Sequence, residues 1–196
     1  RNQTNLHNPF QEYEGTPECG NLGMASVVSR AHNKLLLFKR TKASTNYGRV
    51  SIASRSLDAE NPTLPEEWKV SDFEPKTYFS ATTDVDANMW FVGACELDDG
   101  SLRMVGSFYD EETKLWDLHL FGSNNGGIEW ELLQQKIISR WYNQNDSLVY
   151  PEEVRVISNL KMAASGSWIR IVWVGPADEK FHTLVSSDRG ATWENP

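Results

Sequence analysis

Near its carboxyl end the sequence reads SSDRGATW, residues 186–193. Ser186 and Asp188 carry short polar side chains, which commonly hydrogen-bond to backbone groups a few residues away. Gly190 can adopt a left-handed backbone conformation without a steric penalty. Trp193 offers a large ring that can be buried against a sheet. The pattern therefore predicts a tight turn, held by side-chain hydrogen bonds, that leads into a strand.

The same frame occurs earlier in the chain. Residues 123–130 read SNNGGIEW and share the pattern through Ser123, Asn125, Gly127 and Trp130, with Glu129 in place of the threonine. A third, degraded copy begins at Ser56-Leu57-Asp58, with its tryptophan delayed to Trp68. The three serines are 67 and 63 residues apart.

Polar turns give a second marker of the same period. Each copy is preceded by two apolar runs that meet at Asn33, Gly100 or Gly166, and these turns are 67 and 66 residues apart. Two markers that keep one period indicate internal repeats. Each repeat is too small to bury its own faces, so neighbouring repeats are expected to pack on one another.

Each repeat is predicted to form short antiparallel strands. The expected strands are 24–30, 34–40, 49–56 and 68–70; 88–97, 101–109, 115–122 and 128–133; and 154–163, 168–175 and 181–187. Apolar residues near 134–142 have helical spacing, which predicts a short helical insert.

Repeated four-stranded units are typical of β-propeller blades, of which a closed ring has about four to eight. We expect an all-β partial propeller of about three four-stranded antiparallel blades, with a β-sandwich as the alternative. An irregular segment at 1–20 precedes a propeller segment at 21–196, with blades at about 21–72, 73–135 and 150–196. The last blade is incomplete in the sequence, so further chain or a second subunit is expected to complete the structure.

Composition excludes several classes of function. The 196 residues carry a net charge of −8, which disfavours binding to nucleic acid. No apolar run approaches the roughly 18 residues of a membrane span. The four histidines lack metal-ligand spacing, and no phosphate-binding loop occurs, so neither a metal nor a cofactor is expected.

Cysteines and sequons bear on the compartment. Cys19 and Cys95 form either a disulfide or two buried thiols. Asn2 and Asn145 lie in N-glycosylation sequons. These features favour a secreted or cell-surface glycoprotein.

The two complete octets, at 123–130 and 186–193, resemble the Asp-box, or BNR repeat, of the sialidase superfamily. Residues 105–109 (VGSFY) and 116–120 (WDLHL) are similar to strands of the second blade in its sialidase and trans-sialidase branch. The resemblance implies a propeller in which each box forms the turn between the third and fourth strands of a blade. Box residues in such proteins stabilise the fold and do not contact substrate.

The resemblance also implies a catalytic site whose parts are only partly present. Sialidases clamp the substrate carboxylate with three arginines, use a tyrosine–glutamate pair as nucleophile and use an aspartate as acid and base. The first arginine normally belongs to an F/Y-R-I/L-P motif, but the matching stretch, 20–24, reads GNLGM and has neither arginine nor proline. Arg40 and Asp86 stand where the family places active-site residues. A solvated strand end and an ordinary turn residue are the alternative interpretations of the two positions.

Together these features predict a sialidase-like module that binds a glycan or a protein. The partner would meet the rim or the face opposite the box turns, and the hydrolytic site would be incomplete. Two alternatives stay open: an active glycosidase of the exo-sialidase or trans-sialidase type, and a structural or assembly propeller that binds protein only.

Overall fold

A computed structural model describes residues 24–41, 49–61, 64–73, 89–110, 115–139, 158–174 and 180–194. These segments form three antiparallel sheets and one turn of 3₁₀ helix, η1 (Pro65–Glu67), with no α-helix among the described residues. Within the same ranges, no helix has the length and apolarity that a membrane crossing would require. The fold is all-β, as the sequence predicts.

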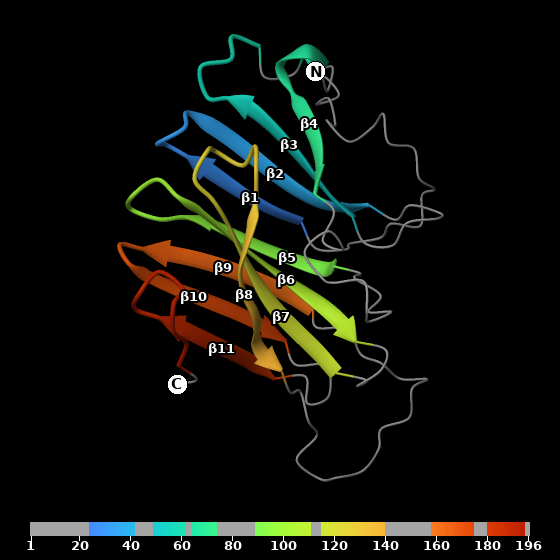
Figure 1. The fold of residues 1–196 in the computed structure, drawn as a ribbon. Helices are drawn as coiled ribbons and strands as arrows, with labels where there is room; N and C mark the ends of the chain where they lie inside the picture. Colours follow the sequence, from blue (N-terminus) through green and yellow to red (C-terminus); the bar gives the residue numbers. More distant parts are fainter. Residues whose placement is uncertain are drawn as a thin grey trace.

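Each sheet follows the order of the chain (Figure 1). We call the sheets blades 1, 2 and 3. Blade 1 holds β1 (Met24–Ser29), β2 (Lys34–Thr41), β3 (Arg49–Ser56) and β4 (Lys69–Phe73). Blade 2 holds β5 (Met89–Glu96), β6 (Leu102–Asp110), β7 (Leu115–Ser123) and β8 (Glu131–Ser139). Blade 3 holds β9 (Ser158–Ser165), β10 (Trp168–Val174) and β11 (Phe181–Ser186).

The blades stack face to face in sequence order. Figure 1 shows blade 2 between the other two, and its first strand, β5, contacts both β1 and β9, the first strands of its neighbours. First strands that lie side by side, with later strands farther out, are the arrangement of propeller blades around an axis. The described chain is therefore a partial β-propeller.

Two apolar cores hold the blades together. Side chains from alternate positions of a strand point to opposite faces of its sheet, so each blade can contribute to a core on either side. The core between blades 1 and 2 includes Val27, Leu36, Phe38, Val50, Ile52, Phe73, Val92, Leu102, Met104, Phe108, Phe121 and Trp130. The core between blades 2 and 3 includes Cys95, Leu97, Val105, Leu118, Leu160, Ile169, Ile171, Trp173 and Leu184. Burial of each large apolar side chain contributes about 1.5–3 kcal/mol.

The three predicted hairpin turns are confirmed. Asn33, Gly100 and Gly166 all have left-handed backbone conformations, with φ values of 52°, 81° and 60°. Each residue lies between the first and second strands of its blade. Glycine and asparagine tolerate this conformation better than other residues, which explains why the turns are visible in the sequence.

The predicted helical insert at 134–142 is wrong over its described part. Residues up to Ser139 belong to β8, which pairs with β7 through Gln134 and Ile138 and contains register shifts. Leu132 packs against the first core and Ile137 against the second. The apolar residues thus serve two faces of a strand, which produced a spacing like that of a helix. The strand also begins later than the predicted 128–133, because Ile128 lies in the preceding turn.

Candidate functional site

The turn at 186–193 is closed by its own side chains. Ser186 Oγ accepts hydrogen bonds from the backbone N–H of Gly190, at 2.8 Å, and of Asp188, at 3.3 Å. Asp188 Oδ1 accepts the Ser186 hydroxyl at 2.7 Å and the Thr192 N–H at 2.8 Å. The Thr192 hydroxyl donates to Asp188 Oδ2 at 2.6 Å. These bonds from Thr192 and Ser186, with the Thr192 hydroxyl foremost, lower the pKa of Asp188 to about 2.

The turn at 123–130 has the same framework with different chemistry. Ser123 Oγ accepts the Gly127 N–H at 3.0 Å and donates to Asn125 Oδ1 at 3.0 Å, and Asn125 Oδ1 also accepts the Glu129 N–H at 3.0 Å. The Asn125 amide then donates to Glu129 Oε2 at 3.1 Å. The neutral amide replaces the aspartate in the turn, and the carboxylate stands four residues later, at an exposed position.

Glycine and tryptophan complete both turns. Gly127 and Gly190 have φ values of 80° and 94° and lie against Leu36 and Leu120 in the cores. Trp130 is buried and packs edge-on against Phe38, with ring centroids 5.9 Å apart. Trp193 is partly buried against the second core and donates from Nε1 to Gln134 Oε1 at 3.2 Å. Both sets of residues therefore have structural roles.

The degraded copy at Ser56 keeps only the first part of the pattern. Ser56 Oγ accepts the Asp58 N–H at 3.1 Å, and the Asn33 amide donates to both side chains. Trp68 does not occupy the equivalent core position. Its ring instead lies 5.5 Å from the Arg55 guanidinium carbon, in a cation–π contact.

Polar contacts join the blades at the end where these turns lie. The Glu96 carboxylate accepts the Ser29 hydroxyl at 2.7 Å and the backbone N–H groups of Arg30 and Ala31, which ties the first hairpin of blade 1 to blade 2. Arg189 makes ion pairs with Asp98 at 3.1 Å and Asp99 at 2.9 Å, which tie blade 3 to blade 2. The turn end is therefore a fixed scaffold for any site beside it.

The predicted site at the opposite end lies mostly outside the described residues. Strand direction places Arg40, near the end of β2, away from the turns at 123–130 and 186–193, and its backbone pairs with Val50. The connections at that end are residues 42–48, 74–88, 111–114, 140–157 and 175–179, none of which the structure describes. They include Asp86, so the proximity of Arg40 and Asp86 stays a prediction.

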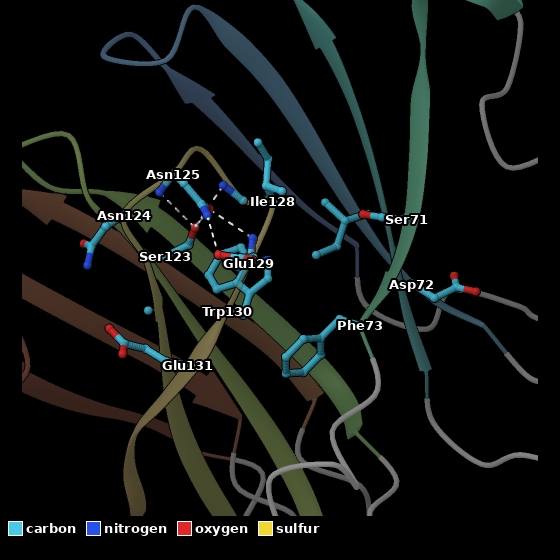
Figure 2. A pocket seen from close by; sticks show the side chains of 13 residues that line it. Ser71, Asp72, Phe73, Ser123, Asn124, Asn125, Ile128, Glu129, Trp130 and Glu131 are labelled. Carbon is cyan, nitrogen blue, oxygen red and sulfur yellow. Dashed lines mark hydrogen bonds between the residues drawn. The ribbon is translucent and has the colours of Figure 1, made fainter.

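A groove at the rim lies between blades 1 and 2. We call it the rim groove; its volume is about 780 Å³. Figure 2 shows the turn at residues 123–130 of blade 2 on one side and β4 of blade 1 on the other. The lining consists of Ile52, Ser71, Asp72, Phe73, Gly122, Ser123, Asn124, Asn125, Gly127, Ile128, Glu129, Trp130 and Glu131. Sequence reasoning missed this groove, because its two sides are brought together only by blade packing.

The polar side chains that line the rim groove include several hydrogen-bond acceptors. Glu129 contributes a carboxylate, whereas the side chains of Asp72 and Glu131 point away from the space between the turn and β4 in Figure 2, and Asp72 accepts the Ser51 hydroxyl at 2.7 Å. No lysine, arginine or histidine is among the described lining residues. Ile128 is 70% exposed and offers an apolar contact. A second hollow of about 490 Å³ adjoins the groove and shares Ser71, Gly127 and Ile128 with it. Unlike the groove, this hollow is also lined by Lys34, Arg55 and Lys69. Polar acceptors around an exposed apolar side chain can bind hydroxyl groups and the apolar face of a ring.

The remaining predicted sites are only partly described. Cys95 is a free, buried thiol whose pKa burial raises to about 12, while Cys19 lies outside the described residues, so the disulfide stays a prediction. Asn2 and Asn145 also lie outside those residues. Over the described part of the chain, no group of three or more histidine, cysteine, aspartate or glutamate side chains is arranged to hold a metal ion.

Comparisons with known proteins support the fold. No family model matches the sequence, and no curated protein has a similar sequence. The Hadza microbial sialidase Hz136 superposes with a TM-score of 0.60 at 11% identity, over 97% of this chain and 36% of that one. The α-L-arabinanase of Penicillium chrysogenum, complexed with arabinobiose, gives 0.60 at 12% identity, over 88% and 47%. An exo-β-1,3-galactanase from Clostridium thermocellum gives 0.55 at 12%, over 88% and 34%.

These similarities establish a fold shared with β-propeller glycosidases. The chain spans between about a third and a half of each of these three structures. At such low identity the similarity concerns architecture alone, because one fold can host unrelated functions.

Proposed function

We propose that this chain is a sialidase-like propeller module that binds a neutral glycan in the rim groove, and that its hydrolytic site is incomplete. The lining of the groove carries this proposal. Its carboxylates and amides can accept and donate hydrogen bonds to sugar hydroxyls, and Ile128 can contact the apolar face of a sugar ring. The turn that bears these groups is fixed by four hydrogen bonds that involve Ser123 or Asn125, so little order has to be gained on binding.

The charge of the groove favours neutral glycans over sialylated ones. Glu129 would face the carboxylate of a sialic acid with like charge, and the nearby Lys34, Arg55 and Lys69 line the adjoining hollow and not the groove itself. The absence of an arginine from residues 20–24 supports an incomplete sialidase site, since that arginine would bind the same carboxylate.

An active glycosidase is the second candidate. The similar structures described as a sialidase, an arabinanase and an exo-β-1,3-galactanase favour it. In that case Arg40 and Asp86 would act at the end of the propeller opposite the box turns. A module that binds only protein in the rim groove is the third candidate.

A location outside the cell belongs to the same proposal. Glycosylation at Asn2 and Asn145 and a disulfide between Cys19 and Cys95 would both fit a secreted or cell-surface protein. Intact-mass analysis of protein expressed through a eukaryotic secretory pathway, with and without glycosidase treatment and reduction, tests these modifications.

Glycan-array binding and sialoside turnover separate the three candidates. We expect binding to neutral oligosaccharides, no binding to their sialylated counterparts and no release of fluorophore from a fluorogenic sialoside. Turnover would contradict the incomplete hydrolytic site. Absence of binding to every glycan on the array would overturn the proposed function and favour a protein partner.

A matched pair of variants tests whether the groove is the binding site. Asn124 and Ser187 occupy the same position in the two box turns, and both are exposed, but only Asn124 lines the groove. Asn124→Ala should weaken glycan binding about 3- to 10-fold, the effect of losing one hydrogen bond. Ser187→Ala should leave binding unchanged. Equal effects of the two variants would place the site elsewhere.

A further inference from the structure

The hollow beside the rim groove differs from the groove in its charge. We call it the basic hollow; its volume is about 490 Å³. Its charged lining consists of three cations and two carboxylates, which are Lys34, Arg55, Lys69, Glu66 and Glu67. Because the whole chain carries a net charge of −8, the basic hollow is a place on an acidic protein where an anion can be attracted.

Two of these cations are held by neutral groups. Lys34, at the start of β2, donates from Nζ to the carbonyl oxygen of Gly126 at 3.3 Å. Arg55, near the end of β3, donates from Nη1 to the carbonyl oxygen of Ser56 at 3.0 Å, and the ring of Trp68 lies against its guanidinium group. Among the described residues, neither cation forms an ion pair with a carboxylate. Both are partly buried, so an anion placed beside them would supply the missing counter-charge.

Neither cation belongs to the repeated frame of the blades. The residue after the hairpin turn is Lys34 in blade 1 but serine in blades 2 and 3. The residue before the first serine of the turn pattern is Arg55 in blade 1 but glycine in blade 2 and valine in blade 3. The hairpins and turns of the other blades form without these charges, which leaves the two cations of blade 1 available for binding.

The divergence of the turn pattern in blade 1 also builds the wall of the basic hollow. An insertion delays the tryptophan to Trp68 and contains η1, which contributes Glu66 and Glu67 to the lining. In blade 2 the corresponding Trp130 is buried in a core, whereas Trp68 lies against Arg55 and helps to fix it. The blade that lacks a complete copy of the turn pattern therefore carries the hollow.

We propose that the basic hollow binds an acidic group, a sulfate or a carboxylate, on the sugar next to the one in the rim groove. This binding rests on the proposed function, since the glycan has to occupy the groove as well. The two spaces share three lining residues, among them Ile128, so a ligand that extends past Ile128 can enter the hollow. An oxyanion there can accept charge-assisted hydrogen bonds from Lys34 and Arg55. An acidic group in the groove itself would meet Glu129, so the sugar bound in the groove is neutral.

The charge of the basic hollow favours a group with a single negative charge. With His32 counted as neutral, three cations against two carboxylates leave a formal charge of +1. A sulfate ester or a carboxylate would offset this charge. A phosphate ester carries about −1.5 to −2 at neutral pH and would exceed it.

Isothermal titration calorimetry with matched oligosaccharides tests the proposal. The parent is the neutral oligosaccharide that binds best on the array, and its derivatives carry one sulfate, or one uronic acid in place of a neutral hexose, at each unit in turn. We expect at least one derivative to bind about tenfold more tightly than the parent, and the series in which it occurs identifies the acidic group. If no derivative binds more tightly than the parent, the basic hollow is not an acid-binding site, although the proposed function stands. If neither the parent nor any derivative binds, the proposed function fails and this binding fails with it.

Charge-removing variants test whether the hollow supplies the gain. Lys34→Gln and Arg55→Gln should each reduce the advantage of the tightest derivative to about threefold or less and leave the Kd of the parent as it is. Arg170→Gln is the matched control, because it removes an exposed positive charge from blade 3, and it should keep the full advantage. Thermal melting checks that each variant is folded. An advantage that survives in both Lys34→Gln and Arg55→Gln, or that falls equally in Arg170→Gln, would overturn the proposal.

Discussion

The turn at residues 123–130 and the turn at residues 186–193 make the same hydrogen bonds but carry their negative charge at different places. In blade 3 the Asp188 carboxylate is used inside the turn, where it accepts bonds from Ser186 and Thr192. In blade 2 the neutral Asn125 accepts the corresponding bonds from the Ser123 hydroxyl and the Glu129 N–H, and the carboxylate of Glu129 lies at the groove. The hydrogen-bonded frame of the turn is therefore separable from its charge, which leaves the carboxylate in blade 2 available for binding.

The largest effect is expected where the two turns are alike, at the glycine three residues before the tryptophan. Alanine at Gly127 or Gly190 would hold a left-handed conformation, and its Cβ would lie 2.6 or 2.7 Å from a buried leucine carbon. Strain and overpacking together should lower the free energy of unfolding by about 2–4 kcal/mol. Urea unfolding of both variants measures this.

Gly166→Ala is the control for the glycine variants. Gly166 also has a positive φ, but no atom lies within 4 Å of the position its Cβ would take. Only backbone strain remains, so the expected loss is about 1 kcal/mol. A loss as large as that of Gly127→Ala would show that packing against the leucines is unimportant.

Removal of the serine hydroxyl should have the next largest effect, and nearly the same effect in both turns. Ser123 and Ser186 are buried, and each accepts a backbone N–H from the glycine four residues later. Ser123→Ala and Ser186→Ala each leave that N–H without its acceptor, which should cost about 1–3 kcal/mol in urea unfolding. A large loss in only one turn would contradict the common frame.

Acid should distinguish the two turns. The pKa of Asp188 is lowered from 3.8 to about 2, so its charge stabilises the folded state above pH 3.8 and this contribution is lost as the pH falls towards 2. Asp188→Asn should flatten the dependence of the melting temperature on pH between 4 and 2. Asn125→Ala, a variant of the neutral residue, should leave the shape of that dependence unchanged. An unaltered acid profile in Asp188→Asn would contradict the role of the charge.

The smallest effect is expected at the left-handed residue that precedes the glycine. Arg189 and Gly126 occupy this position with φ values of 63° and 69°. Arg189→Gly relieves backbone strain but removes exposed ion pairs to Asp98 and Asp99, each of which is worth at most about 1 kcal/mol. We expect a nearly unchanged melting temperature with a weaker dependence on salt. A large drop in low salt would show that these ion pairs are a main link between the blades.

Local features were predictable from the sequence, whereas features built by packing were not. The turns at Asn33, Gly100 and Gly166 are visible because few residues tolerate their backbone conformation. The strand character of residues 134–139 was not visible, because side chains of β8 face two cores and the strand contains register shifts. The rim groove was not predictable either, since its sides come from segments about 50 residues apart.

We propose that the rim groove binds glycan through Ile128 and Glu129, which the turn at 186–193 replaces with alanine and threonine. Isothermal titration calorimetry with the neutral glycan that binds best on the array tests this directly. Ile128→Ala with Glu129→Thr gives the blade 2 turn the residues that the blade 3 turn has at 191 and 192. The turn should still fold, and binding should weaken by at least about tenfold, because an apolar contact and a hydrogen-bond acceptor are lost. Ala191→Ile, the reverse change in the blade 3 turn, should leave the Kd as it is. Unchanged affinity in the Ile128→Ala, Glu129→Thr variant would show that the glycan does not bind through these two side chains.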